Sequence, residues 1–135
     1  MRIRRSALEE LTRHARESQP RECCGILMSR REDPATVSFS LRGTNTETEF
    51  PEQRYALDRV AHLKALDLEY DEGATIIGYY HSHPESSATP SQVDREQAVP
   101  GVTYVIIGLE GDTVSHTVWR LDGDEVVCEP LEVSD

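Results

Sequence analysis

The chain has 135 residues and a formal net charge of −11, with 37% hydrophobic and 29% charged residues. This length and composition predict a single globular domain spanning residues 1–135, and they fit neither a disordered tail nor a membrane protein. The 25 acidic residues outnumber the 14 basic ones, which argues against a general nucleic-acid binder because phosphate contacts dominate that affinity.

The beginning of the chain and its cysteines indicate the compartment. The basic residues Arg2, Arg4 and Arg5 are similar to the start of a signal peptide, but polar residues follow them where an apolar run is needed. No apolar window approaches the roughly 18 residues of a membrane helix. Cys23, Cys24 and Cys128 include no C-x-x-C pair, which favours free thiols over a disulfide framework. We therefore predict a cytoplasmic protein.

The first predicted element is a helix over residues 6–18. Ser6 followed three residues later by Glu9 has the pattern of a capping box. Apolar residues then recur at helical spacing until Pro20 interrupts them. The sequence therefore predicts that Ser6 caps this helix.

Two strands and a second helix follow. Residues 25–29 form a short apolar run typical of a buried strand, and residues 37–41 alternate apolar and polar side chains as a half-buried strand does. Pro51 is predicted to open a helix that Gly73 ends. The predicted core-facing stripe of this helix consists of Ala56, Val60, Leu63, Leu66 and Tyr70.

The second half of the chain predicts mostly strands. Residues 75–83 form a strand, residues 85–89 a loop, and a short helix lies between Pro90 and Pro100. Tight turns join three final strands, so these must be antiparallel. Their predicted ranges are 102–109, 113–121 and 125–131. The fold class we predict is α/β, with a mixed, three-layer arrangement of one sheet and two main helices.

Two histidines on the strand 75–83 suggest a metal site. His81 and His83 are two residues apart, and side chains at this spacing share a strand face. Asp94 follows at the start of the short helix, and the intervening loop is long enough to bring its carboxylate back to the histidines. Two histidines and one carboxylate leave one zinc position open, as in catalytic sites. Water there would have its pKa lowered to about 7.

Two further residues are candidates for catalysis. Ser91 lies one helical turn before Asp94, so its hydroxyl can reach the same place and donate to a developing oxyanion. Glu22 lies where the chain enters its first predicted strand. A carboxylate near a metal can take a proton from water and pass it to a leaving nitrogen, which is the acid–base task of an amide hydrolase.

The segment His81-Ser82-His83-Pro84, followed by Ser91-x-x-Asp94, resembles the signature of JAMM (MPN-plus) metalloproteases. The segment from Glu22 to Gly25 is similar to that family's catalytic-glutamate strand. The resemblance is to the small, stand-alone prokaryotic type, and it implies a curved mixed sheet between helices, related to the zinc deaminases. It also implies one zinc ion bound by His81, His83 and Asp94, with Glu22 as the acid–base and Ser91 as the oxyanion donor.

The resemblance implies a zinc-dependent hydrolase of peptide or isopeptide bonds. Its expected substrate is the C-terminal tail of a ubiquitin-like or sulfur-carrier protein. The chain has little room for specificity insertions, so a homodimer or a partner is one way to complete the cleft. Two alternatives are a metal-containing binding module for a ubiquitin-like partner without turnover, and a DNA-processing relative of the RadC type. The acidic balance argues against the latter.

Each candidate residue also has a purely structural interpretation. Ser91 and Asp94 have the spacing of a capping box, and capping is compatible with catalysis because it fixes the helix that carries Asp94. Cys24 would share a strand face with Glu22, which suggests a cysteine nucleophile, but adjacent thiols at the start of a buried strand are more often core residues. The remaining expectations place His14, His62 and His116 at the surface and Trp119 in the core.

Overall fold

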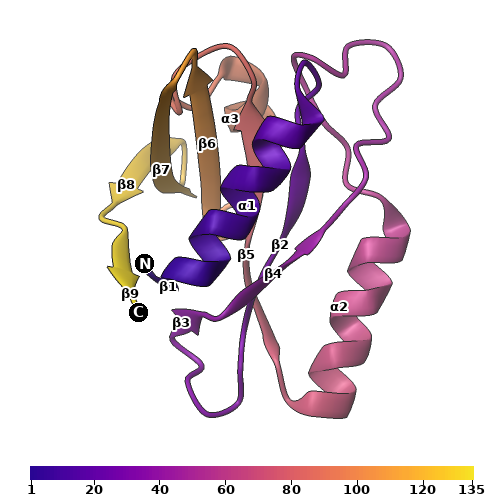
Figure 1. Cartoon of the computed structure of the whole chain (residues 1–135), viewed down its shortest axis with the longest axis vertical. Helices are drawn as coiled ribbons and strands as arrows, with labels where there is room; N and C mark the ends of the chain where they lie inside the picture. The colour runs from indigo at the N-terminus through magenta and orange to yellow at the C-terminus, as the bar shows by residue number, and fades with distance from the viewer.

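The computed structural model describes residues 1–135, which form nine strands and three helices (Figure 1). The helices are α1 (Arg5–Ser18), α2 (Arg59–Glu72) and α3 (Gln92–Gln97). The strands are β1 (Arg2–Arg4), β2 (Cys24–Ser29), β3 (Thr36–Val37), β4 (Phe39–Arg42), β5 (Thr75–His83), β6 (Tyr104–Glu110), β7 (Thr113–Asp122), β8 (Glu125–Glu129) and β9 (Glu132–Ser134).

Six strands form the main sheet, in the order β4-β2-β5-β6-β7-β8. The pair β5 and β6 is parallel, and the other neighbours are antiparallel. The sheet is therefore mixed, and β6, β7 and β8 are antiparallel neighbours, as predicted for the strands joined by tight turns. The strand that carries the histidines lies inside this sheet, with β2 on one side and β6 on the other.

Helices cover both faces of the main sheet, which confirms the three-layer arrangement. Helix α1 crosses in front of the sheet in Figure 1 and buries Ala7, Leu11 and Ala15 against one face, in a cluster that includes Val105 and Ile107 of β6. Helix α2 packs on the opposite face, against β2, β4 and β5. Two separate apolar clusters thus hold the sheet between the helices.

A second, three-stranded sheet of order β3-β1-β9 joins the two chain ends and is all parallel. It was not predicted, and its central strand runs directly into α1. The predicted capping box is wrong for this reason: Arg4 is the N-cap, makes no side-chain capping hydrogen bond, and leaves Ser6 inside the helix. Strand pairing of residues 2–4 fixes where this helix begins.

The predicted strand 37–41 is two strands in two sheets. Strand β3 pairs with β1, whereas β4 pairs with β2. Between them the backbone N–H of Ser38 donates to the carbonyl oxygen of Met28 at 2.8 Å. The alternating pattern was correct for extended backbone, but a pattern of period two carries no information about which sheet a strand joins.

The second helix differs most from the prediction. It begins at Arg59, because the carboxylate of Asp58 accepts a hydrogen bond from the N–H of Ala61 at 3.1 Å and caps it there. Its buried face consists of Ala61 and Ala65. The predicted stripe is instead exposed: Val60 72%, Leu63 55%, Leu66 46% and Tyr70 91%. Small alanines let the helix approach the sheet closely, and the large apolar residues face outward.

The other expectations are met in part. Trp119 is 1% exposed, and Cys23 and Cys24 are buried as free thiols. His14 is buried as well, so its predicted surface position is wrong.

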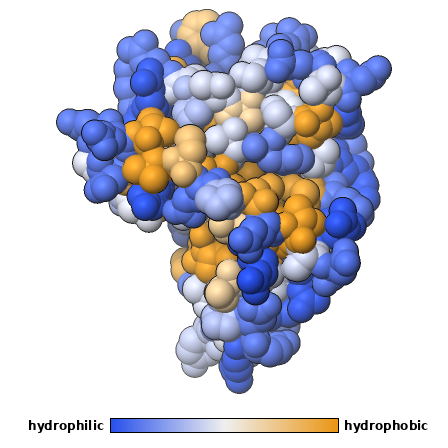
Figure 2. All heavy atoms as spheres, turned by 90° about the vertical axis from the view of Figure 1, so that its left-hand side faces the viewer, coloured by the Kyte–Doolittle hydropathy of each residue, from blue (hydrophilic) through white to orange (hydrophobic).

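Seen from the side that carries β8 and β9, apolar patches alternate with polar side chains on the surface (Figure 2). None of the three helices is long and apolar enough to cross a membrane.

Candidate functional site

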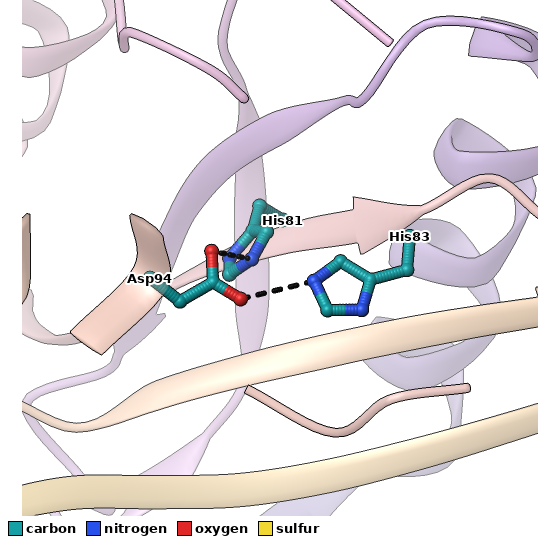
Figure 3. A group of neighbouring side chains, drawn as sticks. All are labelled: His81, His83 and Asp94. Carbon is teal, nitrogen blue, oxygen red and sulfur yellow. Dashed lines mark hydrogen bonds and ion pairs between the residues drawn. The ribbon is translucent and has the colours of Figure 1, made fainter. Parts of the chain in front are cut away.

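The end of β5 and the start of α3 bring together the three predicted metal-ligating residues (Figure 3). Nε2 of His81 lies 3.0 Å from Oδ1 of Asp94, and Nε2 of His83 lies 3.0 Å from Oδ2. The three ligand atoms are all within 4.8 Å of one another, and all three residues are buried. The two-residue spacing on a strand therefore does place both rings at one point.

The first turn of α3 fixes Asp94. The hydroxyl oxygen of Ser91 accepts a hydrogen bond from the N–H of Asp94 at 3.0 Å, and Oδ2 of Asp94 accepts one from the N–H of Ser91 at 2.9 Å. This is the predicted capping box. Its N3 carboxylate also faces the histidines, so one interaction both starts the helix and aims Asp94.

The loop between His83 and Ser91 orients the second imidazole. Nδ1 of His83 donates to the carbonyl oxygen of Ser87 at 2.7 Å. The loop can lie this close because β6 has a glycine beneath it: a Cβ on Gly108 would overlap the backbone of Ser87 and Ala88. This bond sets the tautomer, so that a neutral His83 presents the lone pair of Nε2 to Asp94.

The donor set fits a cation. With Nδ1–H bound to Ser87, the lone pair of a neutral His83 faces a carboxylate oxygen, and two such acceptors need a proton or a metal ion between them. The contact of His81 with Asp94 lacks hydrogen-bond geometry, so both ring nitrogens of this buried residue have no hydrogen-bond partner. Buried polar atoms without partners are costly. Two imidazoles and a carboxylate are ligands that zinc accepts.

The electrostatics of the cluster agree with this interpretation. Burial alone would raise the pKa of Asp94, but the contacts from His81 and His83 outweigh it and hold that pKa well below its usual range. Burial lowers the pKa of His81. The pKa of His83 is raised, because its contacts with Asp94 and the Ser87 carbonyl oppose the effect of burial. The cluster thus keeps Asp94 as a carboxylate in contact with two imidazoles, which is the charge pattern that a bound cation needs.

Glu22 and Ser91 line the same polar cavity. The cavity has a volume of about 310 Å³ and includes His83 in its wall. Glu22 precedes β2 and is only 4% exposed, and its Oε1 has no hydrogen-bond partner. Burial raises the pKa of Glu22 to about 8. The structure therefore brings together all five residues that the sequence singled out.

Ser91 keeps a donor for this cavity. Its oxygen accepts the hydrogen bond of the helix cap from Asp94. A hydroxyl has one proton to donate besides the lone pairs with which it accepts. Its O–H is therefore free for a group in the cavity.

Two residues at the site were not predicted. The ring of Tyr55 stacks on the imidazole of His81, with centroids 4.6 Å apart and an angle of 24° between the planes. Asn45 is buried and hydrogen bonds to the backbone around both Glu22 and Tyr55. Both lie in the loop before α2, where Tyr55 falls within the helix wrongly predicted to open at Pro51, and no spacing rule connects either residue with the histidines.

A second cavity, of about 200 Å³, borders the cluster on the side of His81 and Asp94. In contrast to the first, its wall is mainly apolar and includes Tyr55, Tyr104 and Trp119. The cluster thus lies between a polar and an apolar cavity.

Comparison with known proteins identifies relatives over most of the chain. Residues 4–122 match the sequence model described as prokaryotic homologs of the JAB domain. A desampylase of Haloferax volcanii is 36% identical over 88% of this chain and 86% of its own. A probable TtuB-protein conjugate cleaving protease of Thermus thermophilus is 35% identical over 81% and 70%. A CysO-cysteine peptidase of Mycobacterium tuberculosis is 29% identical over 97% and 89%.

Solved structures agree with the fold. A protein of Desulfitobacterium hafniense superposes with a TM-score of 0.88 at 28% identity, covering 100% of this chain and 94% of its own. A structure titled as the JAMM metalloprotease-like zinc site in the proteasome and signalosome gives a TM-score of 0.62 at 20% identity, with 100% and 98% covered. The latter likeness concerns the fold alone.

Proposed function

The chain belongs to the family of prokaryotic JAB-domain homologs, the small JAMM hydrolases, and on this premise we propose that it is a zinc-dependent protease that releases a ubiquitin-like or sulfur-carrier protein from its conjugates. The observation that carries the proposal is the buried cluster of His81, His83 and Asp94 beside the cavity that contains Glu22. We propose one zinc ion per chain, held by this cluster.

A zinc ion at this position would supply Lewis acidity, lowering the pKa of water at its open coordination position and polarising the scissile carbonyl. The residues of the cluster are arranged to hold it. The Ser91 cap aims the carboxylate of Asp94, and the Ser87 carbonyl leaves Nε2 of His83 free to bind.

Glu22 is the proposed general acid–base. Its carboxylate accepts a proton from the attacking water and delivers it to the leaving nitrogen as the carbon–nitrogen bond breaks. Efficient transfer in both directions needs a pKa near the working pH, and burial raises the pKa of Glu22 to about 8. The same burial keeps bulk water from competing for the proton.

Ser91 is the proposed oxyanion donor. As water adds to the scissile carbon, negative charge develops on the carbonyl oxygen, and the free O–H of Ser91 in the cavity can stabilise it. The helix cap already fixes the oxygen of Ser91, so little reorganisation is needed at the moment of reaction.

The relatives favour a ubiquitin-like protein as the substrate. One is named for cleaving TtuB conjugates, another is named a desampylase, and a third is named for the CysO–cysteine bond. Both isopeptide and peptide bonds are therefore within the proposed class. The single domain over residues 1–135, the cytoplasmic location and a homodimer that completes the cleft stay predictions, and so does the absence of a nucleic-acid partner.

The test combines the zinc content of each protein with its cleavage of an isopeptide-linked conjugate of a ubiquitin-like protein and of a peptide-linked fusion. We expect Glu22→Gln to keep one zinc per chain while kcat falls at least a hundredfold. His83→Ala should lose both zinc and cleavage. Glu49→Gln is a matched acid-to-amide control, because Glu49 is exposed and distant in sequence from the motif.

Each result has a defined meaning. Full cleavage by Glu22→Gln would remove Glu22 from the mechanism. A wild-type protein that binds no zinc would overturn the metal site. Zinc binding without cleavage of either substrate would favour the alternative of a binding module without turnover.

A further inference from the structure

We propose that Tyr55 is a positioning residue for His81, and that Asn45 holds Tyr55 in place. The inference rests on the proposed zinc site and adds two residues from the loop before α2 to the apparatus that orients its ligands. Neither side chain reaches the reacting atoms through any contact in the structure, so their role is to act through His81.

The two imidazoles of the cluster are held in different ways. A metal-bound histidine usually donates its second ring N–H to a carbonyl or carboxylate, which fixes the ring. His83 follows this rule through Ser87. Nδ1 of His81 is buried and has no hydrogen-bond partner, so no hydrogen bond restrains the rotation of this ring.

Stacking supplies the missing restraint. The ring of Tyr55 lies on His81 at a centroid distance of 4.6 Å and an angle of 24°, which is an offset-stacked arrangement. The His81 ring also makes an edge contact with the ring of His83, at a centroid distance of 5.3 Å and an angle of 62°. A rotation of the His81 ring out of this plane would break the stacking, so Tyr55 keeps the ring in the plane that directs Nε2 at the ligand position.

Asn45 is hydrogen bonded to the peptide groups on both sides of Tyr55. Its Nδ2 donates to the carbonyl oxygen of Arg54 at 3.2 Å, and its Oδ1 accepts from the N–H of Ala56 at 3.1 Å. These two bonds fix the backbone from which the Tyr55 ring projects. Asn45 is only 9% exposed, so water competes little for these bonds.

The same amide also reaches the proposed general base. Nδ2 of Asn45 donates to the carbonyl oxygen of Glu22 at 3.0 Å. A second link runs between the two segments, because the N–H of Glu22 donates to the carbonyl oxygen of Pro51 at 2.8 Å. One side chain therefore connects the segment before β2 that carries Glu22 to the loop that carries Tyr55.

The first test measures zinc affinity by competition with a chromophoric chelator, using zinc alone without substrate. We expect Tyr55→Leu to weaken zinc binding about tenfold or more, as loss of an orienting group does in other metal sites. Tyr55→Phe keeps the ring and should bind zinc as the wild type does. Phe50→Leu is the matched control, because Phe50 lies in the same loop, is 42% exposed and does not stack on a ligand.

The second test uses NMR of the metal-free protein, and its first measurement, on the wild type, does not depend on any variant folding. Stacking predicts nuclear Overhauser contacts between the rings of Tyr55 and His81, and upfield-shifted ring protons of His81. In Tyr55→Leu the upfield shift of the His81 ring protons should disappear. The contacts between His83 and its loop should persist unchanged. Absence of the contacts in the wild type overturns the inference.

A double-mutant cycle tests the role of Asn45. Asn45→Asp keeps the shape but replaces the donors to Arg54 and Glu22 with an acceptor. If Asn45 acts on zinc through Tyr55, adding Asn45→Asp to Tyr55→Leu should weaken zinc binding little further. Additive losses would overturn the coupling.

The tests separate two kinds of failure. A wild-type protein without zinc affinity would refute the proposed function. Wild-type zinc affinity in a folded Tyr55→Leu would refute only the positioning role.

Discussion

The last residues of β5 alternate between two environments. Tyr80 and Ser82 face the side covered by α1, where the Tyr80 hydroxyl is hydrogen bonded to Nδ1 of His14 at 2.7 Å and the Ser82 oxygen accepts from the N–H of Cys23 at 2.8 Å. His81 and His83 face the other side and Asp94. All four side chains are buried.

The difference between the two sides is the state of their polar atoms. On the α1 side each hydroxyl has a protein partner, and such pairs stabilise the fold. On the other side His81 has no hydrogen-bond partner, and the lone pairs of the histidines face a carboxylate. On this one strand, the polar groups that have hydrogen-bond partners thus stabilise the fold. The polar groups that need a cation indicate the proposed site.

Zinc should stabilise the protein only through the side of β5 that carries His81 and His83. At a thousandfold excess over its Kd, a ligand specific for the folded state adds about 4 kcal/mol to the free energy of unfolding. We expect this gain in the wild type and in Ser82→Ala, and none in His81→Ala. Urea unfolding with and without zinc measures it. An equal gain in His81→Ala would show that zinc binds elsewhere.

The α1 side should show its own pH dependence through His14. Burial lowers the pKa of His14 to about 4, from an ordinary value of 6.5. The unfolded chain therefore binds more protons between these values, so stability is full above pH 6.5 and falls as the pH drops toward 4, by roughly 3 kcal/mol. Denaturant unfolding of His14→Gln should lack this loss. An unchanged pH profile in the variant would contradict the assignment to His14.

A methyl group on Gly108 should act on the site without touching a ligand. It would push the backbone of Ser87, which holds His83, so we expect Gly108→Ala to weaken zinc binding between tenfold and a hundredfold. Gly78→Ala is the control. Its methyl group would meet the carbonyl oxygen of Thr103, directly before β6, and not the loop that contains Ser87. Chelator competition measures both. Equal losses would show a general effect of sheet distortion.

Removing the Tyr80 hydroxyl should cost stability alone. Tyr80→Phe leaves Nδ1 of His14 buried without its partner, which destabilises by about 1–2 kcal/mol. Zinc affinity should stay within twofold of the wild type, since the hydroxyl lies on the side away from the cluster. Thermal melts and chelator competition on the same samples measure the two effects. A large loss of zinc affinity would mean that the two sides are coupled.

More of the candidate site than of the surrounding fold could be predicted from the sequence. The pairs His81 and His83, and Ser91 and Asp94, obey local rules: a strand period of two and the spacing of a helix cap. Such rules hold within a few residues, so they survive folding. Glu22 was placed at the site by its resemblance to the family, since no local rule connects it with residues 60 positions later.

The errors have a common cause. The apolar stripe of α2 has a correct helical period, yet the helix buries Ala61 and Ala65, because the sheet accepts the face that packs most closely. In the same way, Ser6 has the correct spacing of a cap, but pairing of β1 fixes the start of α1 one residue earlier. Period and spacing describe a segment, whereas burial also depends on what covers it.

By itself, the sequence determined the mixed three-layer class and the grouping of His81, His83 and Asp94, the proposed metal ligands, because short-range geometry decides which side chains of one strand or one helical turn point together. Only the tertiary structure decided that Glu22, Asn45 and Tyr55 meet at that point. Their proximity depends on which strands pair and on hydrogen bonds between loops distant in sequence. These long-range contacts leave no period in the chain.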